Sequence, residues 1–497
     1  VIAQISKTGK FKILDSLQQA VSLGRDAFTD GNIARATVEA CVTALRSFQI
    51  VMREYGIVED RHIRAIATSA VREASNRDAL IDRIQIATGI QVEVIDEAEI
   101  SRLTYLAVRP VLLRQPFFKK SDTLVVEVGG GSTEALMFRK GKVGNSHMYR
   151  LGALRMTQML DTYHAPRSRA VEIMSSHVDS TTDQIHSSLG VTERLHMLAL
   201  GADARFAGSL LQPDWDRKSP IMLKVAALEK LTYKLLKMSS DDLVKCYKLS
   251  FQEAETVGPA LLVYVRLART LKLRRILVAE VNIRSGVLTE MGTGGAWTAE
   301  FKRQIMNSAL AVGRHYQVDL RHARHVAHYA QKLFDCLRVE HRLNTRDEMI
   351  LAVACLLHEA GLYISSSSHH KHSFYLILNS DIFGLGSRDL LLAALVARYH
   401  RGAEPRVGHE GYVSLARNRR LTVNKLSAIL RVANALDRSH TARPLDLTLQ
   451  LEEGTLKIVA NTRSEIAMVQ HRVGERSQLF EQVYGMRVGV CRHGRET

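Results

Sequence analysis

The chain has 497 residues, 46% of them hydrophobic, so it can bury several cores and is expected to fold into roughly three to four domains. Its five cysteines are scattered and never form a CxxC pair, which argues against a disulfide framework and a zinc knuckle. No apolar run approaches the roughly 20 residues of a membrane helix, and we expect a cytoplasmic protein. The formal net charge is +17, so the protein should carry a positive field that attracts polyanions.

The first part of the chain alternates β-rich segments with amphipathic helical segments, an order typical of an α/β fold. Strands are indicated by β-branched residues next to turn residues, and helices by apolar residues that recur three or four positions apart. The predicted elements, in chain order, are a hairpin over residues 1–14, a helix over 33–55, a strand over 63–68, a helix over 78–88 and a strand over 91–95.

A glycine loop follows the next predicted strand, residues 123–128. Consecutive glycines let the backbone turn sharply and aim several N–H groups at one point, and such a nest binds phosphate oxygens. Glu127 and Glu134 flank the loop, and their carboxylates can hold a divalent cation or orient water. No GK[ST] follows, so this is not a Walker A motif, and a plain hairpin turn is the alternative. The predicted phosphate-binding residues are Gly129, Gly130, Gly131, Ser132 and Thr133.

The predicted secondary structure of the chain changes near residue 298. Before that point, further strands over 198–201 and 276–281 extend the α/β body. After it the pattern is nearly continuous helix, including an apolar stripe between residues 323 and 337. The last predicted elements are helices over 348–358, 387–400 and 423–436, and strands over 446–451 and 455–459 joined by a turn at 452–454.

The helical part carries histidines and acids in the order that metal-dependent phosphohydrolases use. Imidazoles and carboxylates at such positions can bind a divalent ion and activate water. The central pair is His-Glu rather than His-Asp, and the longer side chain should disturb the metal geometry, so buried and hydrogen-bonded histidines are the favoured interpretation. The residues concerned are His322, His358, Glu359, His372, His400 and Asp437.

Several short stretches carry a resemblance that spans essentially the whole chain. They are residues 66–74 (IATSAVREA), 125–134 (VVEVGGGSTE), 151–155 (LGALR), 283–288 (IRSGVL), 322–326 (HARHV), 357–361 (LHEAG) and 435–440 (ALDRSH). Together they resemble the exopolyphosphatase / guanosine pentaphosphate phosphohydrolase (Ppx/GppA) family, in its long form with a C-terminal HD-like domain.

The resemblance implies an α/β fold with two ribonuclease-H-like lobes, as in the actin-like ATPase superfamily. An all-α HD-like domain and a small α+β domain would follow. The implied domains are lobe I over 1–103, lobe II over 104–295, the helical domain over 296–442 and the C-terminal domain over 443–497. The first strand of lobe I, with the family's first phosphate loop, would precede Val1, and we expect a segment N-terminal to this sequence to supply it.

The same resemblance implies a function. The chain would release terminal orthophosphate from inorganic polyphosphate, with guanosine pentaphosphate as another substrate, by metal-assisted attack of water. Glu127 would bind Mg²⁺, Glu134 would be the second catalytic carboxylate and Arg72 would contact phosphate, although Arg72 could instead pair with a nearby acid. A homodimer is expected, with no membrane or nucleic-acid partner.

Four departures from the family pattern bear on catalysis: the first phosphate loop is absent from this sequence, Glu127 stands where the family has a shorter aspartate, and two further positions differ. Ile100 occupies the position of the water-activating glutamate, and the adjacent Glu99 points about 100° away around a helix, so it serves as the base only if the helix is offset. Residues 201–205 (GADAR) replace a more glycine-rich nucleotide-side loop, which disfavours close approach of another phosphate. The alternative function is therefore a catalytically weakened protein that binds polyphosphate or alarmone nucleotides and regulates partners.

Overall fold

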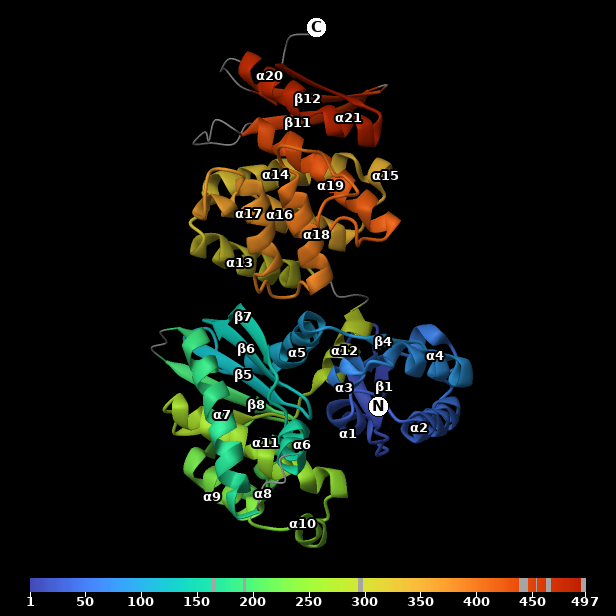
Figure 1. Cartoon of the computed structure of the whole chain (residues 1–497), viewed down its shortest axis with the longest axis vertical. Coiled ribbons are helices and arrows are strands. Elements are labelled where there is room, and N and C mark those ends of the chain that lie inside the picture. The colour runs from blue at the N-terminus through green and yellow to red at the C-terminus, as the bar shows by residue number, and fades with distance from the viewer. Residues whose placement is uncertain are drawn as a thin grey trace. The chain divides into compact units, whose positions relative to one another are not determined.

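The computed structural model describes residues 1–162, 167–190, 194–293, 298–437, 446–452, 454–461 and 466–492. The chain divides into two compact units, residues 1–296 and 297–497 (Figure 1). Among the described residues, no helix combines the length and the apolar character that a membrane crossing requires. The mixed α/β fold with a sheet core that the sequence predicts is confirmed for the first unit.

The first unit begins with two small sheets and the helices around them. The predicted hairpin is present as an antiparallel pair, and the two short strands that follow pair in parallel. Both sheets border an apolar cavity of 970 Å³, whose walls include Ile2 and Ile66. The bounds are β1 Ile2–Ile5, β2 Phe11–Asp15, α1 Leu23–Thr29, α2 Arg35–Glu54, β3 Ala65–Ala67, α3 Ser69–Glu73, α4 Arg77–Thr88, β4 Val92–Val94 and α5 Glu97–Leu112.

The first unit also contains a six-stranded mixed sheet in the order β7-β6-β5-β8-β10-β9. Strands β7, β6, β5 and β8 are labelled in Figure 1. Strands β5, β8 and β10 are parallel neighbours, whereas β6, β7 and β9 run antiparallel to their partners. The bounds are β5 Asp122–Val128, β6 Thr133–Arg139, β7 Lys142–Tyr149, α6 Ala153–Thr162, α7 Arg167–Leu189, β8 Leu195–Leu200, α8 Ala202–Leu211, β9 Ile221–Lys224, α9 Val225–Leu236, α10 Ser240–Tyr247, α11 Phe251–Thr270, β10 Arg275–Val278 and α12 Ile283–Thr293.

The central strand of this sheet is buried on both faces, which explains its continuous apolar sequence. Leu124, Val126 and Val128 point into the main core, where they pack with residues of α6, α7, α9 and α11. Because successive side chains alternate, Val125 and Glu127 point to the opposite face. The polar residue near the end of β5 therefore stands on the face away from the main core.

The backbones of helices α5 and α12 approach each other very closely where the two helices cross. A Cβ placed on Gly286 of α12 would lie 2.1 Å from the carbonyl oxygen of Leu103 in α5, so only glycine fits there. We expect Gly286→Ala to lower the free energy of unfolding by about 1–3 kcal/mol, the usual effect of overpacking, as measured by urea denaturation. Ser285→Ala, one position away, is the matched control. An equal effect of both substitutions would contradict the close crossing.

The second unit is helical up to Asp437 and then forms a small sheet. Strands β11 and β12 form the predicted hairpin, while β13, which pairs in parallel with β12, was not predicted. Glu453 of the predicted turn lies outside the described residues. The bounds are α13 Ala299–His315, α14 Leu320–Cys336, α15 Arg338–His341, α16 Thr345–Leu357, α17 His369–Leu378, α18 Ser387–Arg398, α19 Arg417–Leu436, β11 Asp446–Glu452, β12 Thr455–Asn461, α20 Ala467–Arg476, α21 Gln478–Tyr484 and β13 Arg487–Arg492.

The four-domain division stays a prediction. The expected boundaries near residues 295 and 442 lie outside the described residues. Helix α5 runs unbroken across the third expected boundary, between residues 103 and 104.

Candidate active site

Two glutamates face each other across neighbouring strands at the end of the sheet. Glu127 of β5 and Glu134 of β6 are direct register partners, and opposed residues of an antiparallel pair have Cβ atoms roughly 4.5–5.5 Å apart. The Thr104 hydroxyl on α5 donates a hydrogen bond to Glu134 Oε2 at 2.7 Å, so the pair lies on the face covered by α5. Like charges at this spacing repel each other unless a proton or a cation separates them.

The surroundings raise the pKa of both glutamates. The pKa of Glu134 lies at about 7, chiefly because the group is buried; the charge of Glu127 acts in the same direction and the Thr104 hydrogen bond acts against it. Burial also raises the pKa of Glu127, against the lowering effect of Arg205 and Arg284. Glu134 Oε1 is buried and has no hydrogen-bond partner among the described residues. A carboxylate with these properties can accept a proton near neutral pH or bind a cation.

The glycine loop forms a tight turn between the two strands that carry these glutamates. The Gly129 N–H donates to the Ser132 carbonyl at 2.9 Å. Within the described part of the chain, the N–H groups of Gly130, Gly131 and Ser132 make no hydrogen bond. Gly129 and Gly130 are exposed, so their backbone is accessible to a ligand. The Thr133 hydroxyl is buried and donates to the Leu151 carbonyl at 2.5 Å, so it supports the turn and does not face a ligand.

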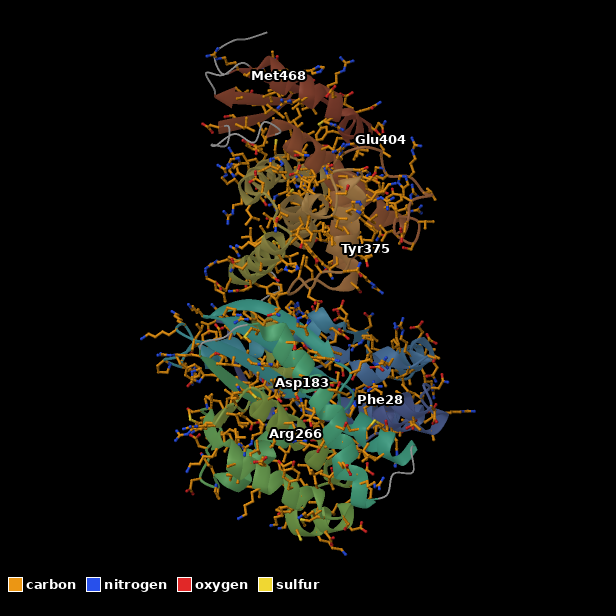
Figure 2. The ribbon with its side chains drawn as sticks, turned by 60° about the vertical axis from the view of Figure 1, so that its left-hand side comes forward. Phe28, Asp183, Arg266, Tyr375, Glu404 and Met468 are labelled. Carbon is orange, nitrogen blue, oxygen red and sulfur yellow. The ribbon has the colours of Figure 1, made fainter. Side chains whose placement is uncertain are left out.

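The glycine loop packs against helices α1 and α3 of the first unit. A Cβ on Gly131 would lie 2.3 Å from Cζ of Phe28 in α1 and 2.9 Å from Oγ of Ser69 in α3, so a side chain at this position is excluded. Phe28 is labelled in Figure 2. The third glycine is therefore required by close packing, whereas the first two form the accessible backbone.

Arg155 fixes the carbonyl side of the loop and was not singled out from the sequence. Its Nε donates to the Gly131 carbonyl at 3.0 Å, and its backbone N–H donates to the Gly130 carbonyl at 3.0 Å. Its guanidinium group also pairs with Glu73 of α3 at 2.7 Å and lies 4.5 Å from the centre of the Phe28 ring. Because Arg155 binds the carbonyl groups of Gly130 and Gly131, the N–H groups of Gly130, Gly131 and Ser132 remain available to a ligand. The LGALR motif was the signal, but its arginine could be interpreted only with its partners in view.

The carboxyl end of β8 lies next to Glu127. Gly201, at φ +96°, connects β8 to α8, and a Cβ there would lie 3.9 Å from Glu127 Cγ. Arg205 of α8 pairs with Glu280 at 3.3 Å, and its Nη1 is buried with no hydrogen-bond partner among the described residues. Burial raises the pKa of Asp203 to about 6. Ligands of open α/β sheets bind outside the carboxyl ends of parallel strands, which is where these groups gather.

The remaining predicted site residues are bound by other partners. Arg72 donates to the Ile95 carbonyl at 3.0 Å and lies 3.8 Å from Glu97. Glu99 accepts two hydrogen bonds from Arg102, at 2.8 and 2.5 Å. Ile100 is 9% exposed and belongs to a small apolar cluster. Glu99 is therefore bound by guanidinium groups, whereas Oε1 of Glu134 has no hydrogen-bond partner among the described residues.

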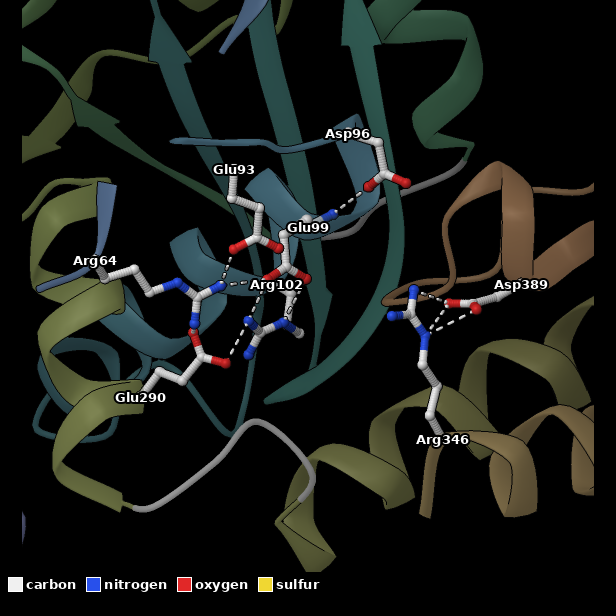
Figure 3. Close-up of polar contacts among 8 residues, drawn as sticks. All are labelled: Arg64, Glu93, Asp96, Glu99, Arg102, Glu290, Arg346 and Asp389. Atoms are coloured by element: carbon white, nitrogen blue, oxygen red, sulfur yellow. Dashed lines mark hydrogen bonds and ion pairs between the residues drawn. The ribbon is translucent and has the colours of Figure 1, made fainter. Parts of the chain in front are cut away.

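Glu99 belongs to a five-membered ion network (Figure 3). Arg102, which is 2% exposed, binds both Glu99 and Glu290 of α12, the latter at 2.8 Å. Arg64 pairs with Glu290 at 2.6 Å and with Glu93 at 3.0 Å. This network joins β4, α5 and α12 beside the candidate active site.

Known proteins resemble both units. The family model described as the Ppx/GppA phosphatase family matches residues 1–293, and the one described as Ppx/GppA phosphatase, domain III, matches residues 305–474. A solved exopolyphosphatase from Cytophaga hutchinsonii is 22% identical, with a TM-score of 0.52, and the match covers 59% of this chain and 93% of that one. A solved exopolyphosphatase-like protein is 21% identical, with a TM-score of 0.51, over 57% of this chain and 93% of that one. The chain belongs to the Ppx/GppA phosphatase family, in its long form.

Proposed function

We propose that this phosphatase releases terminal orthophosphate from inorganic polyphosphate at the β5–β6 loop, with guanosine pentaphosphate as another substrate. One observation carries the proposal: a cross-strand pair of glutamates lies next to a loop in which the N–H groups of Gly130, Gly131 and Ser132 are unbonded among the described residues. Loop amides suit a terminal phosphate, and the carboxylates suit the cation and the water that its hydrolysis requires.

Glu134 is the proposed general base. A carboxylate whose pKa is about 7 can accept a proton from water at neutral pH and is basic enough to assist attack on phosphorus. The Thr104 hydrogen bond fixes Oε2, which leaves Oε1 to receive the proton. Glu99 is a poorer base because two guanidinium groups stabilise its charged form.

The position of Glu127 also fits a magnesium ion. Mg²⁺ prefers carboxylate oxygens and usually retains several waters, and the Glu127 carboxylate stands directly opposite Glu134 beside the glycine loop. Glu127 would be the main protein ligand. When bound, Mg²⁺ would neutralise charge on the terminal phosphate and thereby favour attack by water. Arg205 and Arg284 add positive charge near Glu127.

We expect Glu127→Gln to raise the Mg²⁺ concentration for half-maximal activity by at least about 10–100-fold, since losing even an outer partner of a metal ligand has an effect of that size. The measurement is a Mg²⁺ titration of phosphate release. Asp122→Asn, at the other end of the same strand, is the control and should leave the titration unchanged. An unchanged Mg²⁺ requirement in Glu127→Gln would remove Glu127 from the metal site.

The finer architecture is also part of the proposal. The first unit would comprise two ribonuclease-H-like lobes, and the second an HD-like helical domain followed by the small α+β domain. The six-strand order and the parallel core of the large sheet support the lobe assignment, and the matched domain III supports the second. A cytoplasmic location and a homodimer follow from the family alone.

The alternative is a regulatory protein that binds polyphosphate or alarmone nucleotides without turnover, and it is favoured by Ile100 in an apolar cluster. The deciding assay is orthophosphate release from long-chain polyphosphate with Mg²⁺, run beside a binding measurement with the same polymer. Robust release supports the hydrolase. Tight binding without release supports the regulatory protein.

A further inference from the structure

A buried tyrosine hydroxyl connects the carboxyl ends of strands β5 and β8. Tyr264 belongs to α11 and is 1% exposed. Its Oη accepts a hydrogen bond from the Val128 N–H at 2.9 Å and donates one to the Leu200 carbonyl at 2.5 Å. Val128 is the last residue of β5, and Leu200 is the last residue of β8. One side chain therefore binds both strand ends from which the loops of the candidate active site begin.

The ladder directions show why these two backbone groups face the same hydroxyl. The Gly129 N–H donates to the Ser132 carbonyl, so the backbone N–H of Gly129 points toward the β6 side of the sheet. Hydrogen-bonding groups alternate between the two sides of a strand, so the N–H of Val128 points toward β8. The register of β5 and β8 ends at the pair of Glu127 and Leu200. The Tyr264 hydroxyl therefore bonds the sheet at the last pair of this register.

The Glu127 side chain and the Gly201 turn lie next to this hydroxyl. A Cβ placed on Gly201 would lie 3.3 Å from Tyr264 Oη and 3.9 Å from Glu127 Cγ. Burial raises the pKa of Tyr264 well above its ordinary value, and the charges of Glu127 and Asp203 act in the same direction. The hydroxyl group therefore keeps its proton, so it can donate to one strand end while it accepts from the other.

Helix α11 gives the hydroxyl a fixed position. The helix packs against α6, α7, α9 and β5, and Tyr264 is part of the main core of the first unit. Its first turn is closed by a capping box between Ser250 and Glu253. A side chain that is held by a packed helix can place another group more precisely than a side chain on a loop. The end of β5 is therefore positioned by the core as well as by its neighbouring strands.

We propose that Tyr264 is a positioning residue for phosphate release, because its hydroxyl fixes the end of β5 relative to the Gly201 turn. This inference rests on the function proposed above for Glu127 and the glycine loop. Glu127 comes immediately before Val128 and Gly129 immediately after it, so a shift of the Val128 backbone moves both. Loss of the hydroxyl leaves the aromatic ring in the core and releases the two backbone groups. Its main effect is therefore expected on the geometry of the site.

The first test is Tyr264→Phe, which removes a single oxygen atom. We expect kcat for phosphate release to fall by about 10–100-fold, since a misplacement on the order of 1 Å can have an effect of that size. The Mg²⁺ concentration for half-maximal activity should rise, because Glu127 is displaced. Tyr399→Phe is the matched control: Tyr399 is also 1% exposed, and its hydroxyl lies 2.9 Å from His409 Nδ1 in the second unit.

The Mg²⁺ requirement separates positioning from a structural role alone. A structural role would lower the folded fraction, which circular dichroism measures, and would leave the Mg²⁺ requirement of the folded protein unchanged. Tyr399→Phe should keep the wild-type kcat and Mg²⁺ requirement. If folded Tyr264→Phe keeps both of these values as well, the positioning role is overturned.

A second variant disturbs the same contact from the opposite side and decides the question if Tyr264→Phe does not fold. Gly201→Ala keeps the tyrosine but adds a methyl group close to its hydroxyl oxygen, at a residue whose φ is +96°. Gly89→Ala is its control, because Gly89 has φ +73° and the added Cβ would have no atom within 4 Å. We expect a higher Mg²⁺ requirement in Gly201→Ala alone. Equal Mg²⁺ requirements in the two variants would contradict the proposed role of Tyr264.

Binding of a short polyphosphate with Mg²⁺, measured by calorimetry, distinguishes failure of this inference from failure of the proposed function. If the wild type binds the polymer but releases no phosphate, the hydrolase is excluded, and weaker binding by Tyr264→Phe than by Tyr399→Phe still supports the positioning role. If the wild type is active and Tyr264→Phe equals it in binding, kcat and Mg²⁺ requirement, the function remains and the positioning role is overturned. A wild type that does not bind the polymer would overturn both.

Discussion

Replacement of Glu134 by glutamine is expected to lower kcat for phosphate release by roughly 10²–10⁴-fold, the usual effect of losing a general base. Glutamine has nearly the same shape and can keep the contact with the Thr104 hydroxyl, but it cannot accept a proton. Steady-state phosphate release from polyphosphate at saturating Mg²⁺ measures the effect. Glu229→Gln, in an exposed ion pair with Arg269, is the control and should retain full activity.

The pH dependence gives the same residue a second test. Burial places the pKa of Glu134 at about 7, so the carboxyl group is protonated and inactive at lower pH, and the rate should rise as pH passes through this value. The midpoint should fall when Mg²⁺ is raised, because a nearby cation favours the ionised form. Glu134→Gln should lose this part of the profile. If the variant keeps both the wild-type rate and the wild-type profile, Glu134 is not the base.

Arg102→Met should lower the free energy of unfolding by about 3–5 kcal/mol, because it removes the buried cation that Glu99 and Glu290 share (Figure 3). The loss leaves two carboxylates close together, with Arg64 still paired to both of them. Urea denaturation measures the change.

Arg77→Met is the matched control for this substitution. Arg77 pairs with Asp78 on the surface, where both side chains are well exposed, and such pairs contribute about 0–1 kcal/mol. A comparable loss in the two variants would mean that burial of Arg102 does not determine its contribution. Because the network packs beside Glu134 through α5, we also expect activity of Arg102→Met to fall as the helix shifts.

The local sequence pattern was sufficient to predict where the strand and the loop that carry the glutamate pair would lie. The glycine run after the predicted strand located the turn and its flanking glutamates, and the observed register places Glu127 opposite Glu134. The apolar run over residues 123–128 predicted a strand, and β5 confirms it.

The partners of these elements could not be read from the sequence, because they are set by contacts between distant segments. Arg102 and Glu290 are 188 residues apart, so nothing near Glu99 indicated that its carboxylate would be bound in an ion network. Arg155 was visible only as part of a motif, since its contacts with Gly131 and Glu73 require the folded chain. Strand β13 was missed because its pairing with β12 is parallel and joins segments with two helices between them.

The buried histidines of the second unit show the same limitation. The sequence favoured hydrogen-bonded core histidines, and for Nδ1 of His358 and His322 that interpretation agrees with the contacts observed. It had no means of indicating that Asp437, 115 residues away, would bind Nδ1 of His322, or that Nε2 of His322 would face Asn434 of α19. Both features arise from the packing of α14 against α19.

The most direct measurement is a crystal structure of the Glu134→Gln variant with Mg²⁺ and a short polyphosphate. We expect the terminal phosphate on the N–H groups of Gly130, Gly131 and Ser132, with Mg²⁺ on Glu127. A polyphosphate chain bound elsewhere on the first unit, with those N–H groups unoccupied, would contradict the proposed active site.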